Sequence, residues 1–114
     1  TKNKCSGQFT AQDTHVGFGD IIHGGIIYAI LDDAMANWFY LKGALGYTAK
    51  ADIRYRSHMR AGETGLVEAE LVKRKGKLLF LKSNLVIKKT NLLIAESEAK
   101  FLLSSLGSLD SINR

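Results

Sequence analysis

Apolar residues between positions 26 and 39 recur at the three- and four-residue spacing of a helix. Counting from Ile26, they fall at positions 27, 30, 31, 34 and 38, and further apolar residues occupy most of the remaining positions. This pattern predicts a long helix that is enclosed on most sides. Lys42 followed by Gly43 predicts where it ends. A helix buried in this way needs a sheet around it.

From residue 46 onward the period changes to two, which predicts strands. In the first, Ala49, Ala51, Ile53 and Tyr55 are expected on one face, and further strands follow over residues 67–71, 79–87 and 95–101. Residues 73–77 are expected to form a charged hairpin connection, with a turn near residues 90–91. The sequence therefore predicts an α+β fold, with a central helix on the concave side of a twisted antiparallel sheet.

The remaining segments are expected to be irregular. Residues 1–8 are polar and are predicted to be loose, although a strand could begin at Gln8, and residues 12–20 are expected to form a loop. The tail over residues 104–114 is small and polar, which predicts fraying. A single domain over residues 1–114, with a core of about residues 9–103, is the expected organisation.

Length and composition limit what this domain can be. A chain of 114 residues buries a modest core, so a dimer interface would add to its stability. No apolar stretch reaches the roughly 18 residues of a membrane span, so no membrane partner is expected. The sequence has no signal-peptide pattern and a lone cysteine, Cys5, which together predict a cytoplasmic location.

The formal net charge of +5 suits nucleic acid, anionic lipid or a phosphate-bearing ligand. No aromatic-basic motif of a known RNA-binding type is present, so nucleic acid is not the expected partner. The sequence contains no metal-ligand cluster, no phosphate-binding loop and no Ser-His-Asp order. Neither a metal nor a cofactor is therefore expected.

One set of motifs resembles a known family. His23-Gly24-Gly25 is followed, after six residues, by Asp32, and Thr48 lies sixteen positions further on. With the strand over residues 48–56, Ala61-Gly62-Glu63 and Ala95-Glu96, these residues resemble the hotdog-fold acyl-CoA thioesterases of the PaaI-like, small-thioesterase superfamily. The resemblance covers roughly residues 9–103. Two positions depart from the family pattern, Gly17 where many members have asparagine and His58 where proline is usual.

The residues themselves indicate how a thioester could be hydrolysed. Backbone N–H groups at a helix N-terminus carry partial positive charge and lack intrahelical partners, so the Gly24 amide is the best candidate to polarise the carbonyl. Asp32 is the candidate catalytic carboxylate, either as general base on water or as nucleophile, and its neighbour Asp33 is expected to be exposed. Eight residues of helix span about 12 Å, so Gly24 and Asp32 of one chain cannot both touch one carbon. Two antiparallel helices across a twofold axis would bring them together, which predicts a homodimer, possibly a homotetramer.

Other residues have expected supporting roles. His23 and Gly25 are expected to shape the turn around the substrate, and Thr48 to hold water or Asp32. Tyr28 and Met35 lie near Asp32 in helical spacing and could line an acyl pocket. Basic side chains could hold the phosphates of coenzyme A, with Arg54 and Arg56 foremost and Arg60, Lys73, Arg74 and Lys75 as further candidates.

The expected function is hydrolysis of acyl-CoA to free acid and CoA. Acyl carrier protein is a less favoured carrier. A hotdog module that binds or senses acyl-CoA without turnover remains an alternative, although the presence of both Asp32 and Thr48 argues against it. The His and acid arrangement expected of a hotdog dehydratase is not apparent.

Overall fold

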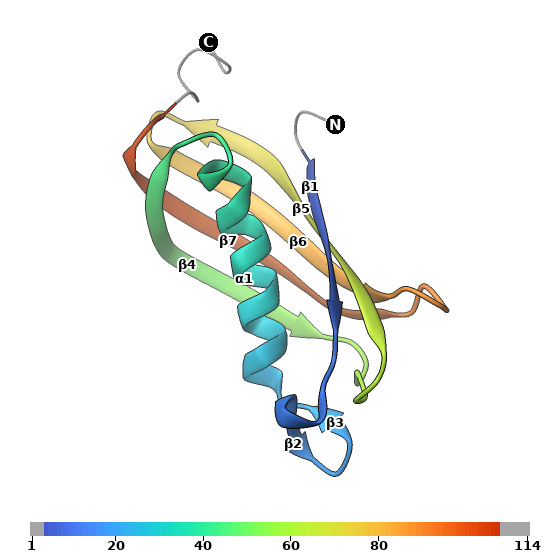
Figure 1. Cartoon of the computed structure of the whole chain (residues 1–114). Coiled ribbons are helices and arrows are strands. Elements are labelled where there is room, and N and C mark those ends of the chain that lie inside the picture. Colours follow the sequence, from blue (N-terminus) through green and yellow to red (C-terminus); the bar gives the residue numbers. More distant parts are fainter. Residues whose placement is uncertain (1–3, 108–114) are drawn as a thin grey trace.

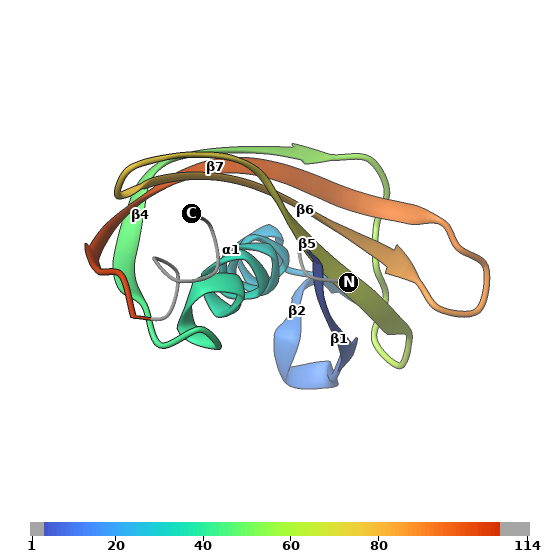
Figure 2. The same cartoon turned by 90° about the horizontal axis from the view of Figure 1, so that it is seen from above.

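A single long helix lies against a curved antiparallel sheet in the computed structural model, which describes residues 4–107 (Figure 1). The predicted helix is α1, Gly24–Tyr40. Seen along the sheet, the strands curve around α1 so that the helix lies on their concave side (Figure 2). This arrangement confirms the predicted α+β architecture.

The main sheet has five strands in the order β1-β5-β6-β7-β4. Their bounds are Lys4–Thr10 for β1, Leu45–Tyr55 for β4, Thr64–Lys75 for β5, Leu78–Ile87 for β6 and Leu93–Ser105 for β7. The strands β5, β6 and β7 form the expected meander, since each pairs antiparallel with the next. The strand β4 pairs only with β7 in the described part of the chain, so it forms one edge of the sheet.

The core lies between α1 and the concave face. Its largest fully buried side chains include Trp38 and Phe39 of α1 and Phe101 of β7. The rings of Phe39 and Phe101 meet edge to face at a centroid distance of 5.3 Å. Burying each such ring stabilises the fold by roughly 1.5–3 kcal/mol.

Within residues 4–107, no helix is long and apolar enough to cross a membrane.

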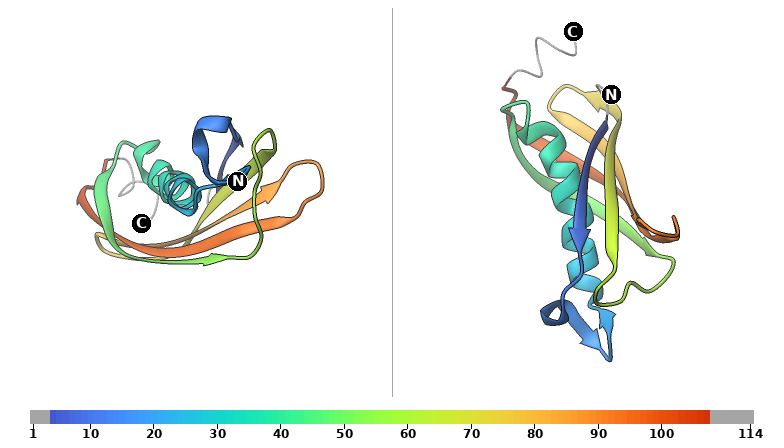
Figure 3. Two further views of the ribbon diagram at one scale, coloured as in Figure 1. Left: turned by 90° about the horizontal axis from the view of Figure 1, so that it is seen from below. Right: turned by 45° about the vertical axis from the view of Figure 1, so that its right-hand side comes forward.

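One stripe of α1 remains open in the isolated chain. The helix was expected to be enclosed on most sides, but residues at three- and four-residue spacing along it are exposed, namely Gly25, Ala29, Asp33, Asn37 and Tyr40. The sheet covers the opposite side of the helix, and within residues 4–107 no second layer lies over this stripe (Figure 3).

A β-bulge in β4 changes which residues face the helix. Thr48 is opposite Phe101 and Lys50 is opposite Lys100, so Ala49 is an extra residue on β4. Such a bulge shifts the alternation by one position. Ala49 is therefore exposed and Thr48 is half-buried on the concave side, in phase with Ala51. The expectation that Ala49 shares a face with Ala51 was wrong, because strict alternation assumes an unbroken ladder.

The N-terminal segment is more ordered than predicted. Residues 4–10 form β1, which pairs along its whole length with β5, from Lys4 opposite Glu70 to Thr10 opposite Thr64. The hydrophobic pattern did not predict β1 because backbone pairing holds most of this strand. Cys5 and Phe9 are its apolar residues that are partly buried against the core. The expected loop over residues 12–20 contains the short helix η1, Asp13–His15, and the strand β2, Val16–Phe18. This strand pairs with β3, Ile21–Ile22, at the N-terminal end of α1.

Two strands are longer than predicted. Residues 73–75 continue β5, where Lys73 is opposite Phe80 and Lys75 is opposite Leu78, so the hairpin turn narrows to Gly76 and Lys77. Gly76 has φ of +59°, which suits glycine in a tight turn. At the other end, Ser104 and Ser105 belong to β7 and not to the tail. Residues 106–107 of the predicted tail follow β7, and residues 108–114 lie outside the described residues.

Candidate active site

The first turn of α1 leaves a single amide without a partner. His23 is the N-cap, and its Nδ1 accepts a hydrogen bond of 2.8 Å from the Gly25 N–H. The His23 carbonyl accepts bonds from the next two amides, those of Ile26 and Ile27. Among the described residues no group accepts from the Gly24 N–H. His23 thus shapes the turn, and Gly24 keeps the free donor.

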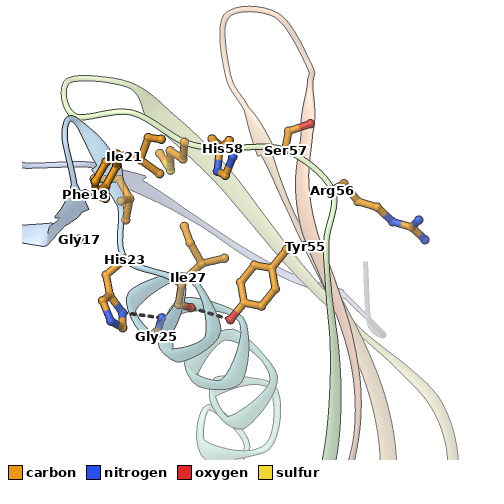
Figure 4. A pocket seen from close by; sticks show the side chains of 13 residues that line it. Gly17, Phe18, Ile21, His23, Gly25, Ile27, Tyr55, Arg56, Ser57 and His58 are labelled. Atoms are coloured by element: carbon orange, nitrogen blue, oxygen red, sulfur yellow. Dashed lines mark hydrogen bonds between the residues drawn. The ribbon is translucent and has the colours of Figure 1, made fainter.

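This free amide lies beside a cavity of about 610 Å³ at the N-terminal end of the helix. The cavity is lined by residues 17–18, 21–25, 27 and 55–59, which come from β2 and β3, from the first turn of α1 and from the end of β4 with the loop after it (Figure 4). The N-terminus of a helix favours negative charge. An oxygen that gains negative charge during a reaction would be stabilised here.

Tyr55 is a site residue that the sequence did not reveal. Periodicity placed it only on a buried face of a strand, whereas its Oη donates a hydrogen bond of 2.7 Å to the Gly24 carbonyl (Figure 4). A side chain on Gly24 would meet this ring, because a Cβ there would lie 3.3 Å from Tyr55 Oη. A bond from a tyrosine to a backbone oxygen 31 positions away has no sequence spacing that could predict it.

Asp32 and Thr48 meet between the helix and the edge strand. Thr48 Oγ1 donates to Asp32 Oδ1 at 2.9 Å, and both residues are half-buried. Within residues 4–107, Asp32 Oδ2 has no hydrogen-bond partner. Asp33, the next residue, is exposed, as predicted. One carboxylate oxygen is therefore held in place and the other is free to bind water or substrate.

Gly24, Tyr28 and Asp32 follow one another at four-residue spacing along α1. The ends of this line meet β4, where Tyr55 contacts Gly24 and Thr48 contacts Asp32. Burial raises the pKa of Tyr28, and the electrostatic interactions with Asp32 and with Tyr55 raise it further. The Tyr28 hydroxyl thus keeps its proton and stays a donor between the two ends of the site.

Tyr28 is not among the residues that line the cavity, and three further predicted substrate-binding residues lie away from it or point away from it. Met35 has no exposed surface and belongs to the core, so substrate cannot reach it in this chain. Arg54 lines a separate polar hollow of about 530 Å³, together with Lys82 and Glu98. Arg56 borders the cavity through its backbone end, but its guanidinium points away and pairs with Glu96 at 2.7 Å (Figure 4).

The other basic candidates are dispersed. Arg60 pairs with Asp20 at 2.6 Å, and Lys73 lies over the ring of Phe80 at 4.6 Å. The β5–β6 hairpin, which carries Lys73 to Lys75, is at the opposite end of the sheet from β2 and β3 (Figure 1). Strand alternation did not indicate this separation, because it gives the face of the sheet on which a residue lies but not its distance from a ligand.

In the described part of the chain, no three His, Cys, Asp or Glu side chains are grouped so that they could hold a metal ion.

The contact between Thr48 and Asp32 leads to a first prediction. Thr48→Val keeps the shape of the side chain but removes the donor, and we expect kcat for the thioester hydrolysis predicted from the sequence to fall about 5- to 30-fold, the effect of losing one hydrogen bond of about one to two kcal/mol. Thr10→Val is the matched control, because within residues 4–107 the side chain of the exposed Thr10 bonds only to the half-buried Thr64. Steady-state kinetics on the purified variants would measure both, and equal rates for parent and Thr48→Val would contradict the role of Thr48.

Comparison with known proteins agrees with this geometry. The profile of the Thioesterase superfamily matches residues 19–94, two thirds of the chain, so the chain belongs to that superfamily. The match includes the start of α1, Asp32 and Thr48. A search of curated protein sequences found no match.

Solved structures share the fold at low sequence identity. A hypothetical thioesterase from Streptococcus pneumoniae TIGR4, solved with coenzyme A, is 10% identical with a TM-score of 0.86, covering 92% of this chain and 81% of its own. Zebra fish thioesterase superfamily member 2 is 24% identical with a TM-score of 0.81, covering 88% and 75%. The PaaI protein of E. coli, from a phenylacetic acid degradation operon, is 16% identical with a TM-score of 0.82, covering 88% and 76%. The predicted hotdog fold is confirmed.

The Streptococcus pneumoniae protein has also been solved as two alanine variants. One replaces an aspartate and the other replaces a threonine, and the two positions are 16 residues apart.

Proposed function

We propose that this protein hydrolyses acyl-CoA thioesters to free acid and CoA. The observation that carries the proposal is the unpaired Gly24 N–H at the start of α1, beside a cavity and on the same helical line as a half-buried carboxylate held by Thr48. These are the two groups that thioester hydrolysis requires, a hydrogen-bond donor for the carbonyl oxygen and a carboxylate that activates water or attacks the carbonyl carbon directly.

The Gly24 amide would polarise the thioester carbonyl. As the carbonyl carbon becomes tetrahedral, its oxygen takes up negative charge, and an N–H already aimed at it stabilises that charge without reorganisation. The Gly25 N–H is unsuited to this role because His23 Nδ1 occupies it.

Asp32 would supply the attack on the carbonyl carbon. As a general base, its free Oδ2 accepts a proton from water while the water oxygen bonds to carbon. The carbon–sulfur bond then breaks, and CoA leaves as the thiol after the sulfur gains a proton. As a nucleophile, the same oxygen bonds to carbon, the carbon–sulfur bond breaks, and CoA leaves as a thiolate that gains a proton. Water then hydrolyses the resulting anhydride to the free acid and restores the Asp32 carboxylate. Thr48 orients the carboxylate in both routes.

A second copy of the chain is needed to bring these groups together. Gly24 and Asp32 are eight residues apart on α1, about 12 Å along the axis, so one thioester carbon cannot touch both in one chain. The edge strand β4 carries Thr48 and Tyr55 beside this line, and edge strands pair readily. Phe18, next to the cavity, is 82% exposed, which fits a surface that a partner covers. We therefore propose a homodimer with two sites across its interface.

A protein of similar fold supports coenzyme A as part of the substrate and Asp32 as the catalytic carboxylate. The Streptococcus pneumoniae thioesterase was solved with coenzyme A. Its aspartate and threonine variants are separated by 16 positions, as Asp32 and Thr48 are here. The same spacing in a hypothetical thioesterase of the same fold favours a functional pair over a chance contact.

The direct test is release of free thiol from short, medium, long and aryl acyl-CoAs. Hydrolysis of at least one ester would support the proposal, and the relative rates would rank the acyl groups. Tight binding without release of thiol would favour a sensor instead.

The shared site makes a prediction about mixed dimers. Asp32→Asn and Gly24→Pro chains are each expected to be inactive alone, but unfolding and refolding them together at equal concentrations should restore about a quarter of the parent rate, because half of the dimers are mixed and each has one intact site. Thiol release after refolding measures this. Failure of the mixture to recover activity, with mixed dimers present by native mass spectrometry, would contradict a site formed across the interface.

A further inference from the structure

The peptide group between Gly24 and Gly25 is held at both of its polar atoms by side chains. Its carbonyl oxygen, on Gly24, accepts a hydrogen bond of 2.7 Å from Tyr55 Oη. Its N–H, on Gly25, donates one of 2.8 Å to His23 Nδ1. Figure 4 shows both bonds reaching this one turn of helix from opposite sides. The peptide plane is thereby fixed from two directions.

The location makes this arrangement unusual among helix starts. The first amides of a helix have no intrahelical acceptor, and two consecutive glycines have more backbone freedom than any other pair of residues. An unrestrained Gly-Gly start would sample several orientations. An N-cap side chain alone restrains the N–H side of this peptide, and Tyr55 adds a restraint on the carbonyl side.

Tyr55 is well placed to act as a rigid support. It lies at the end of β4, paired with Ala95 of β7, so its backbone is fixed by the sheet and not by the helix. The absence of a side chain on Gly24 lets the ring come close, since a Cβ there would be 3.3–3.5 Å from Tyr55 Oη, Cζ and Cε1. The hydroxyl therefore connects the first turn of α1 directly to the edge strand.

We propose that Tyr55, acting with His23, is a positioning residue that holds the Gly24 N–H in place beside the cavity. This inference rests on the proposed thioesterase function. The free N–H belongs to the His23–Gly24 peptide, which precedes the Gly24–Gly25 peptide that the two side chains hold. Rotation of the Gly24–Gly25 peptide would therefore change the backbone conformation at Gly24 and with it the orientation of the free N–H. A donor that is already oriented costs no reorganisation when charge develops on the carbonyl oxygen.

Tyr55→Phe tests the proposal because it keeps the ring and removes only the hydroxyl. We expect kcat for the best acyl-CoA of the panel to fall about 5- to 30-fold while KM stays within about twofold, since the bond acts on the transition state through Gly24. Tyr47→Phe is the matched control, because Tyr47 is on the same strand and 58% exposed, and it should behave like the parent. An unchanged kcat in Tyr55→Phe, or a rise in KM alone, would overturn the proposal.

A second measurement separates this inference from the proposed function. Hydrogen exchange of the Gly25 amide, followed by NMR in the absence of substrate, is expected to be at least about tenfold faster in Tyr55→Phe than in the parent or in Tyr47→Phe, since the peptide loses the restraint that the Tyr55 hydroxyl adds to those of His23 and of the helix. If exchange is faster but the parent hydrolyses no thioester, the restraint is real and the proposed function fails. If exchange is unchanged, Tyr55 does not hold this peptide, whatever the activity.

Discussion

Asp32→Asn is expected to lower kcat for acyl-CoA hydrolysis by roughly 10²- to 10⁴-fold, the range attributed to a general acid or base. Asparagine keeps the side-chain shape and an oxygen that can accept from Thr48 Oγ1. It has no negative charge with which to take a proton or attack carbon. The loss should therefore appear in the rate and leave the fold intact, as circular dichroism and gel filtration would show.

Asp33→Asn is the matched control for this variant. Asp33 is the next residue on the same helix and is exposed, so the substitution makes the same change in charge and composition without touching the site. Its activity should lie within about twofold of the parent, because substitutions at exposed positions away from special features have small effects. If Asp33→Asn lost the activity and Asp32→Asn kept it, Asp32 would not be the catalytic carboxylate.

Gly24→Pro is expected to reduce kcat about 10²- to 10³-fold, the cost of removing one donor to a developing oxyanion. Proline deletes the N–H that has no partner in the described chain, so no structural hydrogen bond is lost. The position is also suited to it. Gly24 is the first helical residue, where proline is tolerated, and His23 before it has φ of −59° and ψ of 135°, in the region that a residue preceding proline prefers.

Gly24→Ala separates the loss of the donor from the added bulk. Alanine places a Cβ at the same point, 3.3 Å from Tyr55 Oη, but keeps the N–H. We expect it to retain most of the activity after a shift of a few tenths of an ångström in the tyrosine. Thiol release and thermal unfolding of both variants would measure this. Equal losses in the two variants would show that bulk, and not the amide, matters.

The sequence was most informative where burial imposes a regular period. The helix and the three strands of the meander were predicted because each has one face in the core, so apolar residues recur at fixed spacing. The strand β1 was missed because it contributes few buried side chains and is held by its backbone to β5. The phase of β4 was wrong because one extra residue, Ala49, breaks the alternation that the prediction assumed.

The site was predictable only in part. The free amide of Gly24 followed from the physics of helix termini, and Asp32 with Thr48 followed from a family resemblance, since a contact across 16 residues has no periodic signature. Tyr55 and the cavity depend on how β4 passes the helix, which no local pattern encodes. Arg54 and Arg56 were proposed from charge alone, and charge does not indicate which way a strand residue faces or that Glu96 already pairs with Arg56.

The extra residue in β4 makes the position of Thr48 in the candidate site depend on the number of residues in the strand and not on which residues they are. Thr48 faces Asp32 because one residue, Ala49, is left out of the pairing between Thr48 and Lys50. Deleting Ala49 would leave every candidate site residue in the chain and yet move either the threonine or the following half of the strand to the opposite face. Alignments that allow a free gap in this strand can therefore match every motif residue of a relative while misplacing its site.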